Sequence, residues 1–226
     1  MTYCVEMTED EHRELDNEVA GCAAAHQRLH QTLNDAAEGN LDALDPTKAS
    51  ALPDWTIGHV LTHIARNADA FRFMIEGANA GEQRLMYPSA EARNVGIDAG
   101  ANRTLDALID DVRASSWALE ASWAALTAVG WDGAGLTRNG PTPIRSMPWR
   151  RWREVEVHHA DLGLSTFGPS DWSSAFVASD LARELREWEA DGGVLPQEVA
   201  TAAPWQRLAW LYGRNSGLLS PSQTWG

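Results

Sequence analysis

The chain has few cysteines, and they do not form a motif. Cys4 and Cys22 are the only two among 226 residues, and they lack the close spacing of a zinc or redox pair. A chain of this length can bury a large core without disulfides or a structural metal. We therefore expect Cys22, which lies in an alanine-rich helical segment, to be a small buried side chain.

Long hydrophobic runs are also missing. No segment approaches the ~20 apolar residues that a membrane-spanning helix needs. The acidic N-terminal segment lacks the basic and apolar regions of a secretory signal peptide. These absences predict a cytoplasmic protein that does not associate with a membrane.

Basic residues are scarce, and only one of them is a lysine. Lys and Arg total 18 against 32 Asp and Glu, which gives a formal net charge of -14, and Lys48 is the single lysine. This charge repels phosphate backbones and argues against a nucleic-acid partner. Arginine is the cation best suited to bidentate recognition of carboxylates, so acidic small molecules are the favoured ligands.

Apolar residues recur at helical spacing in four segments, which predicts a mainly α protein built as a four-helix bundle. Thr8 and Glu11 form a capping-box pattern at the start of the first segment. In the third segment we expect Trp117 to be buried. The expected helices cover about residues 8–39, 54–81, 102–127 and 146–163.

The remaining segments are harder to assign. Residues 86–97 and the Gly- and Pro-rich residues 130–148 are expected to be connectors, and connectors as long as the second tend to be functional. Beyond Gly163, helical patterns lie near 172–191 and 204–213. Short strands are possible at 194–195 or 199–201. We therefore divide the chain into a bundle, residues 1–163, and a small helical or α+β C-terminal subdomain, residues 164–226.

Histidines on the second helix are candidate metal ligands. On a helical wheel His63 lies roughly 110 degrees from the centre of the apolar stripe, at the edge of the bundle. His59 lies nearly opposite that centre and is expected in solvent. A lone imidazole at the edge is more often structural than ligating, so His63 needs partners from another helix.

The fourth helix offers two pairs of partners. Glu154 and His158 are spaced i,i+4, whereas Glu156 and His159 are spaced i,i+3, and either pair can point the same way. Glu156 and His159 fall on the side of Trp152, where burial would cost free energy unless both are fully hydrogen-bonded. The pair on the polar flank, Glu154 and His158, is therefore the better metal clamp.

His63, Glu154 and His158 together form a set of two histidines and one carboxylate with open coordination positions. Such a set is typical of a catalytic metal site. Nitrogen and oxygen ligands admit zinc, nickel or iron. His26 and His30 are also spaced i,i+4, but no third partner is evident beside them, and we expect a solvated or interhelical role.

Four sequence motifs are similar to those of the mycothiol-dependent maleylpyruvate isomerase family, a metal-binding branch of the DinB-like four-helix bundles. They are DWTIGHVLTHIARNAD, MYPSAEARN, REVEVHHADLG and LYGRNSG. The resemblance covers most of residues 8–163 and is thinner afterwards. It implies that His63, Glu154 and His158 bind zinc, and that Arg214 acts in catalysis or binds a substrate carboxylate. Arg93 lies in the EARN motif and has the chemistry for the same carboxylate-binding role.

The resemblance also implies a reaction and a cofactor. A metal-bound thiol, mycothiol or a similar small thiol, adds as a thiolate to the cis double bond of maleylpyruvate or a related compound. The new single bond rotates, and elimination leaves the trans isomer. Arg93 and Arg214 would hold substrate carboxylates and stabilise the enolate. Asp161, one turn beyond His158, is a candidate to orient that ligand.

One departure from the family keeps other functions open. Isomerases of this family carry a C-terminal domain with strands, whereas this chain has at most one short strand candidate there. Related bundles activate thiols for S-transfer to an electrophilic metabolite or xenobiotic, which is the main alternative. A second alternative is a metal- or thiol-binding stress or sensor protein without turnover. Either a monomer or a small homo-oligomer is compatible with the sequence.

Overall fold

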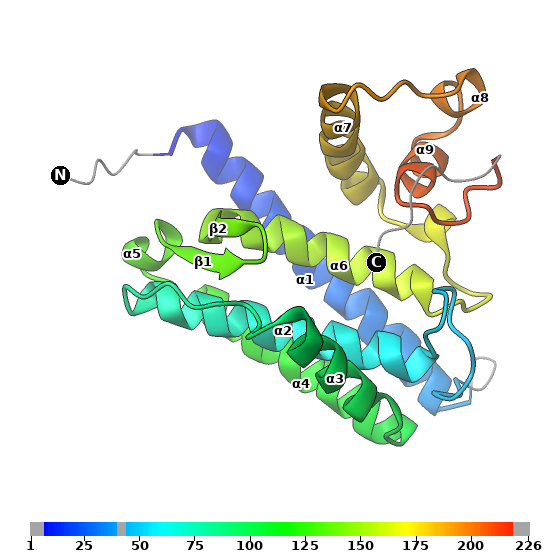
Figure 1. Ribbon diagram of the computed structural model, residues 1–226, viewed down its shortest axis with the longest axis horizontal. Coiled ribbons are helices and arrows are strands. Elements are labelled where there is room, and N and C mark those ends of the chain that lie inside the picture. Colours follow the sequence, from blue (N-terminus) through cyan, green and yellow to red (C-terminus); the bar gives the residue numbers. More distant parts are fainter. Residues whose placement is uncertain (1–6, 40–43, 219–226) are drawn as a thin grey trace.

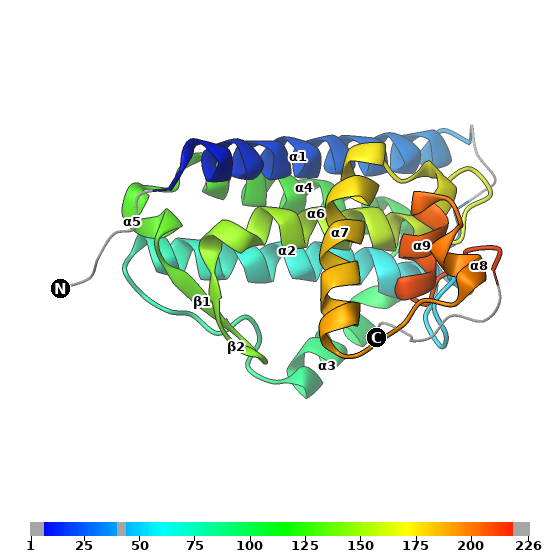
Figure 2. The same cartoon turned by 90° about the horizontal axis from the view of Figure 1, so that it is seen from above.

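Four long helices form the body of the protein in a computed structural model that describes residues 7–39 and 44–218 (Figures 1 and 2). Helix α1 packs against α4 and α6, and α2 packs against the same two helices. This arrangement confirms the predicted mainly α, four-helix bundle. The four helices are α1 (Glu9–Ala37), α2 (Ile57–Asn79), α4 (Leu105–Ala124) and α6 (Met147–Asp161).

Side-chain caps fix where the first three of these helices begin. Thr8 accepts a hydrogen bond from the backbone of Glu11, and the Glu11 carboxylate accepts one from the backbone of Thr8, which completes the predicted capping box. Thr56 and Thr104 cap α2 and α4 in the same position. The core between the helices is built from fully buried aliphatic side chains, including Leu29, Leu33, Leu61, Ile64, Leu108, Leu119 and Val155.

Helix α3 (Ala90–Ala101) lies where the sequence predicted a connector. Ser89 caps its N-terminus, and the helix lies along the start of α2 (Figure 1). Only Ile97 and Ala101 of α3 are buried, so the helix has almost no apolar stripe. The connector prediction for residues 86–97 was therefore wrong because the helical periodicity is too weak to recognise.

The second predicted connector contains a small hairpin. It follows the short helix α5 (Ala128–Trp131). Strands β1 (Ala134–Thr137) and β2 (Gly140–Pro143) pair in antiparallel orientation, and the 3₁₀ turn η1 (Ile144–Ser146) leads into α6. The sequence of β2 resembles a loop because it contains two prolines, and proline is rare in strands except at edges and first positions. Leu136 of β1 also pairs with the chain at Leu85, which attaches the hairpin to the segment after α2.

The part of residues 164–218 that has regular structure is helical. It comprises the 3₁₀ turn η2 (Pro169–Asp171), α7 (Ser174–Ala190), α8 (Gln197–Ala200) and α9 (Pro204–Leu211). The two strand candidates, 194–195 and 199–201, were wrong: residues 194–195 are irregular and Val199 lies within α8. Trp117 on α4 was also misassigned, since it is 57% exposed.

A buried polar cluster joins the bundle to the C-terminal helices. Asp180 of α7 accepts hydrogen bonds from Trp149 Nε1 at 2.7 Å and Arg153 Nη2 at 2.8 Å, both on α6. It also accepts one from the hydroxyl of Tyr212, at the end of α9. A domain boundary at residue 163 remains a proposal. In residues 7–39 and 44–218, no helix combines the length and apolarity needed to cross a membrane.

Candidate metal centre

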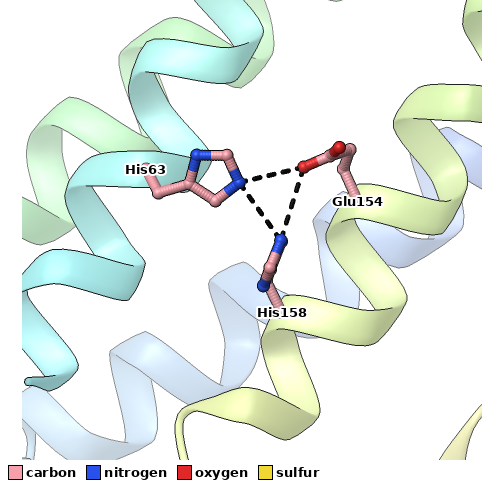
Figure 3. Close-up of side chains that lie close together, drawn as sticks. All are labelled: His63, Glu154 and His158. Atoms are coloured by element: carbon pink, nitrogen blue, oxygen red, sulfur yellow. Dashed lines mark hydrogen bonds and ion pairs between the residues drawn. The ribbon is translucent and has the colours of Figure 1, made fainter. Parts of the chain in front are cut away.

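Three side chains from two helices converge beside the bundle core (Figure 3). His63 Nε2 of α2 lies 3.0 Å from Glu154 Oε2 and 3.1 Å from His158 Nε2, both on α6. His158 Nε2 lies 3.5 Å from the same Glu154 oxygen. The sequence-predicted ligand set is thus brought together as a triangle of two nitrogens and one oxygen.

Helix geometry explains the convergence. Glu154 and His158 are one turn apart on α6 and therefore face α2 together. His63 meets them from α2 and is 3% exposed, deeper than the bundle edge that the helical wheel suggested. The ring of Trp55, just before α2, meets His63 edge-on at 5.6 Å and adds to its burial.

The triangle has the size and chemistry of a metal site. Imidazole nitrogen and carboxylate oxygen are the donors that zinc and similar divalent ions take. Ligand distances of ~2.0–2.1 Å around a tetrahedral ion put neighbouring donors ~3.3 Å apart, close to the spacings here. His63, Glu154 and His158 are also the one cluster of three potential ligands within 4.8 Å among the described residues. These residues fit a divalent ion.

The charges in this cluster stabilise one another. Burial would raise the pKa of Glu154, but hydrogen bonds from His158 and His63 lower it well below its ordinary range. Burial would lower the pKa of His158, but its contacts with Asp161 and Glu154 raise it to about 9. Burial and the neighbouring His158 lower the pKa of His63 to about 4. The carboxylate of Glu154 is therefore ionised at neutral pH and suited to bind a cation.

A carboxylate contacts the ring nitrogen of His158 that does not face the other two ligands. His158 Nδ1 lies 2.9 Å from Oδ2 of Asp161, the last residue of α6. Asp161 in turn accepts hydrogen bonds from Nε and Nη2 of Arg214, at 2.7 and 2.9 Å. Arg214 is 8% exposed and its guanidinium is directed at Asp161. The structure therefore places Arg214 next to the ligand set, with Asp161 between them.

Arg93 lies at the Nδ1 side of the His63 ring, away from Glu154 and His158. Its Nη2 lies 3.3 Å from His63 Nδ1, and its guanidinium lies 6.0 Å from the centre of the Trp55 ring. Tyr87, in the segment before α3, was missed by sequence reasoning although it lies in the MYPSAEARN motif. Burial raises the pKa of its hydroxyl to about 12, with a contribution from Glu154, so the group remains a hydrogen-bond donor at neutral pH.

The two histidines set aside by sequence reasoning have structural contacts. His59 is not in free solvent, because its Nδ1 accepts from the backbone of Thr56 at 3.2 Å and completes the cap of α2. His159 is buried, stacks on Phe167 at 3.6 Å and lies 3.0 Å from the hydroxyl of Thr32.

The remaining candidates are also accounted for. Glu156 accepts from Trp152 at 3.1 Å and pairs with Arg28. His26 bridges helices through Glu120 at 2.7 Å and the buried Arg151 at 3.1 Å, which is the interhelical one of its two expected roles. Cys22 is fully buried, as expected, whereas Cys4 lies outside the described residues.

Comparison with family models identifies the N-terminal bundle. The model described as the mycothiol maleylpyruvate isomerase N-terminal domain matches residues 22–163, well over half of the chain. The chain belongs to this family. The matched residues include His63, Arg93, Glu154 and His158. The match ends before Arg214.

Solved structures agree on the fold. The chain is similar to the crystal structure of the mycothiol-dependent maleylpyruvate isomerase, with a TM-score of 0.80 and 24% identity over 93% of this chain and 97% of that one. A histidine-to-alanine mutant of a mycothiol-dependent maleylpyruvate isomerase gives the same values. Comparison with curated proteins gave no match. The likeness covers nearly all of the chain, so the fold of the described residues is a DinB-like bundle with an appended C-terminal part.

Proposed function

We propose that this protein is a metal- and thiol-dependent cis-trans isomerase that acts on maleylpyruvate or a related unsaturated dicarboxylate. The observation that carries the proposal is the triangle of His63, Glu154 and His158 in a member of the maleylpyruvate isomerase family. We assign zinc as the metal and mycothiol, or a similar small thiol, as the cofactor. A reduced thiol cofactor is consistent with the cytoplasmic location that the sequence favours.

The need for an outside thiol is supported by Cys22, the cysteine within the described residues. Cys22 is fully buried, and burial raises the pKa of its thiol, so it cannot supply a thiolate to a substrate. When bound to the three ligands, a divalent ion supplies the missing chemistry, because it lowers the pKa of a coordinated thiol toward neutrality. The three side chains that hold this ion leave positions open for such a ligand.

Arg93 is proposed to bind a substrate carboxylate. Arginine has no acceptor, so its contact with His63 Nδ1 requires that nitrogen to be unprotonated. If neutral His63 uses Nε2 as a ligand atom, its proton must be on Nδ1. Nη2 of Arg93 then has no acceptor on His63 and is available to pair with an anion beside the metal centre, while Nη1 donates to Asn94.

The assay follows isomerisation and thiol in one reaction. Purified protein with one equivalent of Zn²⁺ is mixed with mycothiol and maleylpyruvate, and the enol absorbance of the substrate and the free thiol are measured together. We expect the substrate to isomerise without net loss of thiol. Glu154→Gln should abolish turnover because it removes the anionic ligand, whereas the exposed Glu189→Gln on α7 should not.

Two other results would contradict the isomerase assignment in different ways. Stoichiometric loss of thiol with an electrophile would make the protein an S-transferase. Metal binding with neither isomerisation nor thiol loss would make it a binding or sensor protein. The Glu154→Gln variant shows in each case whether the effect depends on the metal centre.

A further inference from the structure

The contact between Asp161 and Arg214 links the C-terminal segment to a ligand of the metal centre. Asp161 is 1% exposed, and its carboxylate accepts from His158 on one side and from two nitrogens of Arg214 on the other. A buried carboxylate that is shared in this way cannot move without breaking several charge-assisted hydrogen bonds. The orientation of the His158 ring therefore depends on where Asp161 is held.

The position of Arg214 is fixed by the end of α9. Gly213 adopts φ 66°, the left-handed conformation that glycine tolerates best. The Gly213 N–H donates to the carbonyl of Trp210 at 3.1 Å, and the Arg214 N–H donates to that of Ala209 at 2.8 Å. These two bonds form a Schellman motif. The motif turns the chain back, so that Arg214 reaches Asp161 across 53 positions of sequence.

The guanidinium is bound along its whole edge. Nε and Nη2 donate to the two oxygens of Asp161, and Nη1 donates to the carbonyl of Tyr212 at 2.8 Å. The planar fork of arginine matches a carboxylate in this bidentate manner, and lysine cannot reproduce it. This geometry differs from the substrate-binding role that the sequence motif implies for Arg214, because the carboxylate it pairs with belongs to the protein.

The two histidines of the triangle are supported differently. Nδ1 of His158 faces a carboxylate, whereas Nδ1 of His63 faces the cation of Arg93. Metal-binding histidines commonly donate their second N–H to a carboxylate, which fixes the tautomer and makes the ligand nitrogen more basic. His158 has such a support in this site and His63 does not, so the affinity for the metal depends strongly on Asp161.

We infer that Arg214 is a positioning residue that acts on the metal centre through Asp161 and His158. It holds the Asp161 carboxylate in place, and Asp161 orients the Nε2 atom of His158 toward the metal position. The inference rests on the metal centre of the proposed function, but not on the reaction. In this way the C-terminal segment contributes to metal binding although it supplies no ligand.

The test measures Zn²⁺ affinity of the full-length protein by competition with a chromogenic chelator, without thiol or substrate. Asp161→Asn should weaken binding about 10- to 100-fold, the usual effect of losing such a support. Arg214→Gln should weaken it about tenfold, and Arg214→Lys should restore only part of the loss. In the double variant the two effects should not add, because both act through one carboxylate. The exposed Arg186→Gln on α7 is the matched control.

A second readout guards against simple loss of folding. The visible absorption spectrum of bound Co²⁺ reports ligand geometry, so it should change in Asp161→Asn and Arg214→Gln, while circular dichroism remains that of wild type. Wild-type Zn²⁺ affinity and an unchanged Co²⁺ spectrum in Arg214→Gln would overturn the inference. Fully additive effects in the double variant would also overturn it.

The outcomes separate this inference from the proposed function. Metal bound by wild type but unaffected by the Arg214 variants rejects the positioning role alone. Metal bound and weakened by these variants, without isomerisation, rejects the isomerase and keeps the positioning role. A wild-type protein that binds no Zn²⁺ rejects both.

Discussion

Histidine residues show how neighbours decide the role of one side-chain type. His63 and His158 share the acceptor Glu154, and an ion can be held where the three meet. His159 stacks on an aromatic ring, with a hydroxyl as its polar contact, and His26 bridges two helices. Of these histidines, only His63 and His158 have ligand atoms that face a common point, so the candidate metal centre is defined by convergence rather than by the presence of histidine.

Arg93 provides a prediction about substrate binding. Arg93→Lys keeps the charge but loses the planar fork that pairs with a carboxylate. We expect KM for the dicarboxylate to rise about tenfold, equivalent to ~1.4 kcal/mol, with unchanged metal content. Steady-state kinetics together with metal analysis would check this. Arg72→Lys on α2, at a side chain that is 42% exposed, is the control, and equal effects of the two substitutions would contradict the assignment.

His159 provides a prediction about pH. Burial and the nearby Arg28 lower the pKa of His159 to about 3 from an ordinary 6.5. Between these values the unfolded chain takes up a proton that the folded chain does not, so the stability conferred by neutral His159 is lost as pH falls below 6.5. We therefore expect the free energy of unfolding of metal-free wild type to fall as pH is lowered, by up to ~1.4 kcal/mol per pH unit more than that of metal-free His159→Gln. Urea unfolding of both proteins at several pH values would check this. Parallel pH profiles for the two proteins would contradict this.

The convergence of the candidate ligands could be anticipated from sequence because it depends largely on local spacing. Glu154 and His158 are one turn apart, and the wheel put them on a polar flank, where an ionised pair is cheaper to maintain. The contact between Asp161 and Arg214 could not be predicted in this way. It depends on how α9 docks, and spacing within one helix carries no information about that.

Helix α2 has to lie very close to α3, and glycine makes this possible. A Cβ added at Gly58 would lie 2.1 Å from the carbonyl oxygen of Ala101 and 3.1 Å from that of Pro46. Both atoms belong to backbone, so they cannot rotate away as a flexible side chain could. The start of α2, five residues before His63, is therefore fitted to its neighbours.

Two alanine substitutions test this fit at the level of the element. Gly58→Ala should reduce the free energy of unfolding by about 1–3 kcal/mol through overpacking. Gly96→Ala lies inside α3 with no atom within 4 Å of the added Cβ, and it should stabilise the protein by about 0.5–1 kcal/mol. Denaturant unfolding of both variants would check the pair. A stability gain in Gly58→Ala would show that the close approach is not real.

Elements with a strong apolar stripe were predicted, and those without one were missed. The sequence located α1, α2, α4 and α6 because each buries a continuous face. Helix α3 buries two residues, and the hairpin strands are four residues long, with two prolines in β2, so neither element gives a periodic signal. Their positions are set by contacts with α2 and with the segment after it, which are tertiary interactions.

At the scale of the whole molecule, the C-terminal helices are joined to the bundle by the cluster around Asp180. Asp180→Asn should remove one ion pair of Arg153, which keeps its pair with Glu184, and it should also remove the anionic acceptor of Trp149 and Tyr212. Breaking a buried pair completely typically costs about 3–5 kcal/mol. Because Glu184 still pairs with Arg153, we expect a smaller but clear drop in thermal stability. The exposed Glu189→Gln on the same helix should have little effect. Equal melting temperatures for the two variants would show that the cluster does not join the two parts.

Metal binding by four single variants tests the central claim most directly. Elemental analysis after Zn²⁺ loading should find about one ion per chain in wild type, as a single three-ligand site requires, and also in His59→Ala and His159→Ala. His63→Ala and His158→Ala should lose it, because each removes a side chain of the triangle. Full occupancy in His63→Ala and His158→Ala, with loss in His59→Ala or His159→Ala, would contradict the proposed centre.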